Sequence, residues 1–219
     1  MSILLWVLKS CKRELYIVLI TLAVLMSIPA AAVVVFADAG IQLISDALVS
    51  VNPATRLVEI FDSNGNKVAE LELSTNWPAR GYVSDEFGTW EAWRKAMGLG
   101  PHTGIDIANQ YGDYGDPITP FMVGKVLYNH DVDDNSCGKF VKLQHEHNIT
   151  SLYCHLDNTA GITPGTNVKP GDIIGYMGNT GSSTGVHLHF MIQVYGINVN
   201  PRTFMVGEPE GSVSRVPSF

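Results

Sequence analysis

Apolar positions follow three patterns along the chain, and the first is a long uninterrupted run. Residues 15–36 contain no charged side chain over 22 consecutive positions. A helix of that length, at 1.5 Å per residue, spans a bilayer core of ~30 Å. The run therefore predicts one transmembrane helix.

The charges beside this run predict its orientation. Three basic residues precede it, and the first charge that follows is Asp38. Basic residues gather on the cytoplasmic side of a membrane, so we expect residues 1–14 in the cytoplasm and the rest of the chain outside. A signal peptide cleaved near Ala37–Ala39 is the alternative. The run exceeds the ~7–15 apolar residues of such signals, which favours a retained anchor.

The second pattern is a helical spacing followed by alternation. Residues 41–51 keep apolar residues at helical intervals, which predicts a short helix that Pro53 stops. Alternating segments at Leu57–Phe61 and Lys67–Leu71 flank an Asn-Gly pair, the strongest short signal of a β-hairpin. We therefore expect residues 37–76 to form a juxtamembrane helix and a hairpin stalk.

The third pattern is a series of short alternating strands, which follows a predicted short helix at Trp90–Met97. Gly, Pro, Asn and Asp bound the strands, and even spacing of such strands is typical of an antiparallel β sandwich or barrel. The predicted strands are Gly104–Ala108, Val123–His130, Lys139–His145, Ile149–Leu156, Asp172–Met177 and Val186–Val194. We expect a mostly β domain at 77–205 and a disordered tail at 206–219.

The charge balance argues against one class of partner. The formal net charge is −7, and the part after the predicted anchor holds 11 Lys and Arg against 20 Asp and Glu, a balance of −9. Binding nucleic acid phosphates requires a basic surface. We therefore expect no nucleic acid partner.

Two of the three cysteines are expected to lie near each other. Cys11 falls on the cytoplasmic side, whereas Cys137 and Cys154 fall outside, where disulfides persist. A hairpin that pairs residues 139–145 with 149–155 brings Cys137 and Cys154 together. The interpretation that we prefer is a disulfide between them, and two free thiols are the alternative.

Candidate chemistry lies in two motifs that are far apart in sequence, His102-x-x-x-Asp106 and His187-Leu-His189. Imidazole nitrogen and carboxylate oxygen are ligands of zinc, and catalytic zinc keeps three protein ligands plus a position for water. Residues i and i+2 of a strand share a face, so His187 and His189 point into one groove. A structural histidine pair is the alternative for the second motif taken alone.

With Tyr153-Cys-His-Leu156, these motifs resemble those of the lysostaphin-type zinc endopeptidases, which cut peptide bonds in bacterial peptidoglycan. The resemblance runs from about Gly81 to Phe204 and implies a β fold of the duplicated hybrid motif type. It implies Zn²⁺ as the cofactor, a peptidoglycan peptide as the substrate, and a zinc-activated water as the nucleophile. The implied zinc ligands are His102, Asp106 and His189, and the implied catalytic residues are His155 and His187.

In a bacterium, the predicted anchor places this domain on the periplasmic or extracellular side of the cytoplasmic (inner) membrane. Secretion, conjugation or division machinery is then a candidate partner. Two positions depart from the family pattern: Val186 stands where Pro is usual, and Met191 stands where Glu is common. Gly175–Gly185 is expected to form a wall of the groove, and His145 is interpreted as structural.

Two other functions compete with hydrolysis. A non-catalytic peptidoglycan-binding scaffold, or an activator of other wall hydrolases, is the main alternative, although the complete set of five site residues argues against it. A swinging-arm carrier is suggested by the hairpin-like segment Val168–Gly175. That segment lacks an exposed lysine between methionines, so the carrier interpretation fails. The bond cleaved does not follow from the sequence.

Overall fold

The computed structural model describes residues 40–212, which belong to one compact unit. The predicted cytoplasmic residues 1–14 and the predicted anchor at 15–36 lie outside the described residues. Within 40–212, no helix has the length and apolar character needed to cross a membrane. The described chain is mostly β and all its strand pairs are antiparallel, as predicted for the domain.

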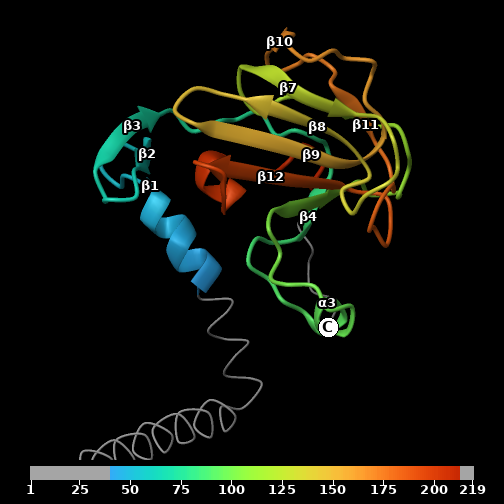
Figure 1. Ribbon diagram of the computed structural model, residues 1–219, viewed down its shortest axis with the longest axis horizontal. Coiled ribbons are helices and arrows are strands. Elements are labelled where there is room, and N and C mark those ends of the chain that lie inside the picture. The colour runs from blue at the N-terminus through green and yellow to red at the C-terminus, as the bar shows by residue number, and fades with distance from the viewer. Residues whose placement is uncertain (1–39, 213–219) are drawn as a thin grey trace, which may run out of the picture. The chain divides into compact units, whose positions relative to one another are not determined.

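The main sheet has ten strands, and its long strands lie side by side in Figure 1. Its strands are β4 (Tyr82–Asp85), β5 (Ile105–Ala108), β6 (Pro117–Ile118), β7 (Gly124–His130), β8 (Lys139–Gln144), β9 (Ile149–Asn158), β10 (Asn167–Val168), β11 (Gly175–Met177), β12 (Leu188–Val194) and β13 (Ile197–Val199). Their order along the sheet is β10-β7-β8-β9-β12-β5-β4. β11 pairs with β6 and β9, and β13 pairs with β12.

Strand β12 shows how the sequence pattern creates the two faces of the sheet. Its alternate residues are fully buried: Leu188, Phe190, Ile192 and Val194. On β9, the ring of Tyr153 lies 5.3 Å from that of Phe190, so the core face is filled by interlocking aromatic and aliphatic side chains. The intervening positions of β12 are only partly buried, which leaves them free to carry a site.

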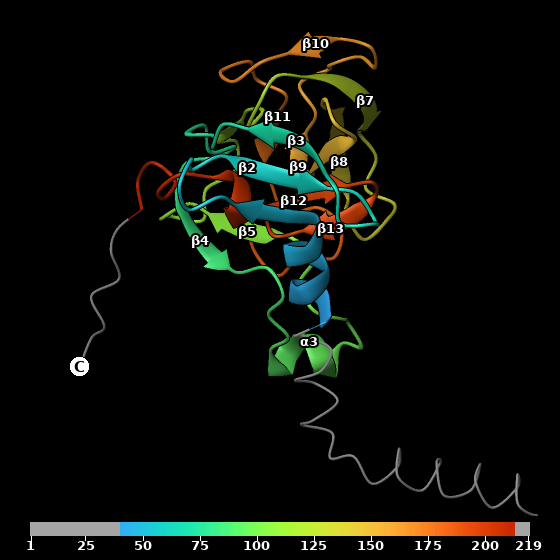
Figure 2. The same ribbon diagram turned by 90° about the vertical axis from the view of Figure 1, so that its left-hand side faces the viewer.

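The N-terminal part of the described chain packs onto the main domain, although the sequence predicted a stalk. A helix at residues 40–48 leads into a three-stranded sheet of β1 (Val49–Val51), β2 (Val58–Phe61) and β3 (Lys67–Leu71), which faces the viewer in Figure 2. Val58 and Ile60 are buried in the same core as the main sheet. The backbone N–H of Asn200 donates to Ser45 Oγ at 2.8 Å, so the helix is tied to the C-terminal segment.

The hairpin was predicted correctly, but the helix before it was predicted too long. The helix ends at residue 48, because Val49–Val51 pairs with Val58–Ile60 as a third strand. A short helix, α3 (Ala92–Ala96), lies inside the predicted range 90–97, and a 3-10 helix, η1 (Pro201–Phe204), follows β13.

The predicted disordered tail is partly wrong. Residues 206–212 are described, and they are held against the domain. The backbone N–H of Gly81 donates to the carbonyl of Glu210 at 2.8 Å, and the Ser212 hydroxyl donates to the carbonyl of Gly81 at 2.8 Å. Residues 213–219 lie outside the described part of the chain.

Candidate metal centre and groove

The pairing of β12 with β5 and β9 assembles the centre of the site. His189 on β12 lies opposite Asp106 on β5 and opposite Cys154 on β9. His102, in the loop before β5, reaches the same point, and its side chain is 1 % exposed. His102 and His189, 87 positions apart in sequence, therefore meet through the pairing of β5 with β12 and the loop that leads into β5.

Three donor atoms from these residues form a tight triangle. His102 Nε2 lies 2.9 Å from His189 Nδ1 and 3.0 Å from Asp106 Oδ1, and His189 Nδ1 lies 2.7 Å from the same oxygen. Tetrahedral zinc with bonds of 2.0–2.1 Å needs donor atoms about 3.3 Å apart. Two imidazoles and a carboxylate, moved outward by a few tenths of an ångström, match the chemistry and size of such a centre.

The surroundings prepare these atoms to bind a cation. His102 Nδ1 lies 3.0 Å from the carbonyl oxygen of Glu86 and donates to it, since a carbonyl can only accept. The Nε2 lone pair is thereby left to face the centre, the arrangement that metal-binding histidines have. Burial opposes ionisation of Asp106, but its contacts with His102 and His189 prevail and hold the pKa of its carboxyl well below its usual range.

The other two predicted site histidines lie beside this triangle. The rings of His155 and His187 are 4.8 Å apart, and the ring of His155 is 5.7 Å from that of His189. His155 Nδ1 donates to the carbonyl of Thr180 at 2.7 Å, and His187 Nδ1 donates to the carbonyl of Gly185 at 2.8 Å. In both neutral rings Nε2 is therefore the acceptor. Burial, with smaller contributions from His187 and His189, lowers the pKa of His155 to about 4.

A β-bulge directs His155 into the groove. Val141 pairs with Tyr153 and Lys139 pairs with Leu156, so two residues of β9 lie opposite one residue of β8. His155 takes up the extra length with a φ of 63° and donates its N–H to the carbonyl of Cys137 at 2.9 Å. Simple alternation would place neighbouring residues on opposite faces, but Cys154 and His155 both line the groove.

The predicted disulfide is present between Cys137 and Cys154, 17 residues apart. It links the loop before β8 to the bulge on β9. Because Cys154 is bonded in this way and fully buried, it has no free thiol with which to act as a nucleophile.

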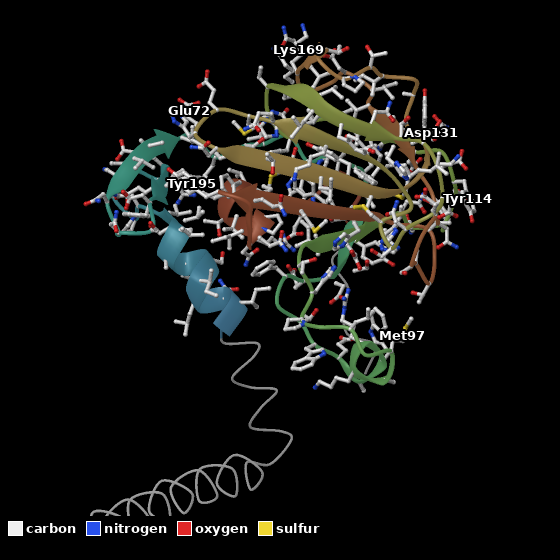
Figure 3. The ribbon with its side chains drawn as sticks, viewed as in Figure 1. Glu72, Met97, Tyr114, Asp131, Lys169 and Tyr195 are labelled. Carbon is white, nitrogen blue, oxygen red and sulfur yellow. A yellow bond between two sulfur atoms is a disulfide. The ribbon has the colours of Figure 1, made fainter. Side chains whose placement is uncertain are left out.

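The five histidine and aspartate side chains open into a cavity of about 470 Å³. Ser182–His187 form one wall, which confirms that the end of the predicted glycine-rich wall lines the groove. The α3 segment, which we define as residues 90–99, contributes Glu91, Trp93, Arg94 and Leu99 to the cavity. Figure 3 labels Met97 on this segment, and this residue is 59 % exposed.

The second His-x-His pair lies apart from the cavity lining. His145 is buried, with Nδ1 2.8 Å from the carbonyl oxygen of Val123 and Nε2 2.7 Å from Ser151 Oγ. Its structural role is therefore confirmed. His147 sits in the turn with a φ of 56°.

Two charged residues of the site could not be identified from the sequence. Asp85 Oδ2 lies 3.4 Å from His102 Nδ1, and Arg94 lies against Asp85. Neither residue belongs to a motif, and their separation of nine positions gave no signal of a contact. The sequence predicted the short helix that carries Arg94, but not the contact of Arg94 with Asp85.

Comparison with known proteins gives a consistent result. A family model described as peptidase family M23 matches residues 100–201. DD-carboxypeptidase/endopeptidase Mpg of Neisseria meningitidis serogroup B is 34% identical over 109 residues, which are 50% of this chain and 24% of that protein. Peptidoglycan DD-endopeptidase ShyC of Vibrio cholerae serotype O1 is 36% identical over 145 residues, which are 65% of this chain and 31% of that protein. The chain thus spans about a quarter to a third of these relatives.

A solved structure supports the fold. A zinc containing peptidase from Vibrio cholerae superposes with a TM-score of 0.52 at 23% identity, over 70% of this chain and 47% of that one. At this identity the likeness concerns the fold alone. Residues 40–99, including the α3 segment, precede the part of the chain that the family model matches.

Proposed function

Because residues 100–201 form a domain of peptidase family M23, as the motifs predicted, we propose that this protein is a zinc-dependent endopeptidase that hydrolyses peptide bonds of bacterial peptidoglycan. One observation carries the proposal. Three donor atoms from His102, Asp106 and His189 lie within 3.0 Å of one another. The acceptor nitrogens of two further histidines border the same cavity. A peptide needs such an open cavity beside a metal centre to be cleaved there.

The protein's own groups provide the proton transfers. Zinc, when bound, supplies Lewis acidity that acidifies water and polarises a carbonyl. His155 and His187 are held by carbonyl acceptors in the tautomer that leaves Nε2 free. Either Nε2 can therefore take the proton of the attacking water. The resulting imidazolium N–H then donates to the developing oxyanion or returns the proton to the leaving amine.

The test compares the full chain with a His189→Ala variant and a His147→Ala control. His147 is an exposed imidazole in a turn, so its removal leaves the cavity intact. We expect about one zinc per chain and release of muropeptides from purified peptidoglycan by the parent and the control. Both properties should be lost in His189→Ala, and product masses would identify the bond. Zinc binding by the parent without any cleavage would favour the scaffold or activator instead.

We also propose that the protein is anchored in the bacterial cytoplasmic membrane by residues 15–36, with its catalytic domain outside. The uncharged run and the basic residues before it support this placement. The disulfide of the domain supports it independently, because such bonds persist outside the cytoplasm. The protein should resist alkaline extraction from membranes, and protease added to spheroplasts should remove the domain. Release by alkali, or protection from that protease, would contradict the placement.

A further inference from the structure

The α3 segment builds a wall of the groove from residues outside the matched family domain. Its helix buries none of its residues, so core packing does not account for its position. A hydrogen bond within the segment joins its two ends, because Trp90 Nε1 donates to the carbonyl of Leu99 at 2.7 Å. In Figure 1 it projects beyond β4, at the edge of the main sheet. A segment that packs so little but lines the cavity is a candidate for contact with substrate.

Arg94 is the basic group that this segment brings to the cavity, which Glu91 also lines. Its side chain is 12 % exposed, and its Nε and Nη2 donate to Asp85 Oδ2 at 3.3 and 3.2 Å. Its guanidinium carbon lies 4.7 Å from the centre of the Trp93 ring. Stacking of this kind leaves the edge of the guanidinium available to hydrogen-bond. Nη1 has no hydrogen-bond partner among residues 40–212, so part of the five-donor fork is unused.

The position of Arg94 defines what it can reach. Its Nη2 lies 3.9 Å from Asp106 Oδ2, and Asp106 is one of the three proposed zinc ligands. Consecutive Cα atoms of a peptide are 3.80 Å apart. A substrate group held by the guanidinium would therefore lie about one residue's length from a proposed zinc ligand, close to the bond to be cleaved.

The neighbouring carboxylates do not occupy every N–H donor of Arg94. Asp85 is shared, because it accepts the Thr89 hydroxyl at 2.5 Å and lies close to His102. Asp106 directs its other oxygen to the histidines of the centre. A planar fork with a free edge matches a carboxylate, which accepts two parallel N–H donors and binds more strongly than a neutral carbonyl does.

We propose that Arg94 forms a subsite for a free carboxylate on the substrate residue next to the scissile bond. This inference rests on the proposed peptidoglycan hydrolysis, because it names a selectivity of that same groove. The protein would thus distinguish wall peptides with a free carboxylate at this position from those whose carboxylate is amidated.

The test measures binding, so that it does not depend on cleavage. The probes are a stem pentapeptide ending in D-Ala-D-Ala and the same peptide as its C-terminal amide. They are titrated calorimetrically into the full chain in detergent, with zinc present and with His155→Ala introduced to prevent consumption of the peptide. We expect the acid to bind about 10- to 100-fold more tightly than the amide. Arg94→Gln should remove this preference, and Arg94→Lys should restore only part of it.

Lys95→Gln is the matched control, because it removes a charge from the same helix without touching the cavity lining. It should keep the preference. Asp85→Asn, with zinc content measured alongside, separates direct binding from an effect through His102. It should keep the preference if Arg94 itself binds the carboxylate. The subsite would be overturned if Arg94→Gln and Asp85→Asn lost the preference for the acid and the bound zinc to the same extent. It would also be overturned if the parent bound both probes equally, or bound neither detectably.

Failure of the hydrolase proposal would be recognised separately. The chain with an intact His155 would then cleave neither the probes nor purified peptidoglycan, whatever the ratio of the two affinities.

Discussion

His155 and His187 share one arrangement, in which Nδ1 donates to a backbone carbonyl and Nε2 is left to act. Replacing either by Gln removes the titrating group but none of the proposed zinc ligands. We expect kcat to fall by about 10²–10⁴ while zinc remains near one per chain. Metal analysis and steady-state kinetics on the same preparations measure both quantities. Loss of zinc from His187→Gln would show instead that His187 is a ligand.

The buried His145 predicts a specific pH dependence of stability. Burial lowers the pKa of His145 to about 4, and the hydrogen bond to the carbonyl of Val123 offsets part of this shift. In the unfolded chain its pKa is ~6.5, so between these values the unfolded state binds more protons and stability falls as pH falls. His145 alone should account for about 3 kcal/mol of lost unfolding free energy between pH 7 and pH 4.

Urea unfolding of the parent and of His145→Gln across this range isolates the contribution of His145. The variant should be less stable at pH 7, yet it should lose less stability on acidification, because Gln does not titrate. Parallel curves for the two proteins would show that protonation of His145 has no part in acid unfolding.

Among the strands and turns, sequence reasoning succeeded where local signals decide and failed where a distant partner decides. β7, β8 and β9 begin within one residue of prediction, since Gly, Asn and Asp bound them. Val49–Val51 continues the apolar spacing of the preceding helix, and only its pairing with β2 makes it a strand. The bulge at His155 was likewise invisible, because it depends on the register between β8 and β9.

The disulfide between the loop before β8 and strand β9 is expected to stabilise the element that carries the proposed catalytic His155 as well as the fold. A bond that closes a loop of this size contributes about 3 kcal/mol. Reduction should therefore lower Tm by roughly 6–12 °C. Since His155 donates its N–H to Cys137, we also expect kcat to fall more than KM rises. Thermal melts and kinetics with and without reductant test this, and Cys11→Ser should respond as the parent does. An unchanged Tm would contradict it.

For the chain as a whole, the structure places the start of the folded unit before the predicted domain boundary at residue 77. Helix 40–48 and strands β1–β3 bury Leu48, Val49, Val58 and Ile60 in the core shared with the main sheet. Each such side chain stabilises by roughly 1.5–3 kcal/mol, and a whole domain has a net stability of only about 5–15 kcal/mol. The segment predicted as a stalk is therefore expected to be required for folding of the domain.

Truncated fragments distinguish a folded unit that starts near residue 40 from one that starts at residue 77. A fragment of residues 40–219 should remain soluble with the Tm of the full chain, because it keeps the whole shared core. A fragment of residues 77–219 should aggregate or melt at least 10 °C lower, since it exposes the surface that β1 and β2 cover. A fragment of residues 52–219 keeps β2 and β3 but lacks β1, so it should fall between them. If 77–219 proved as stable as 40–219, the N-terminal layer would be the separate stalk that the sequence pattern predicted.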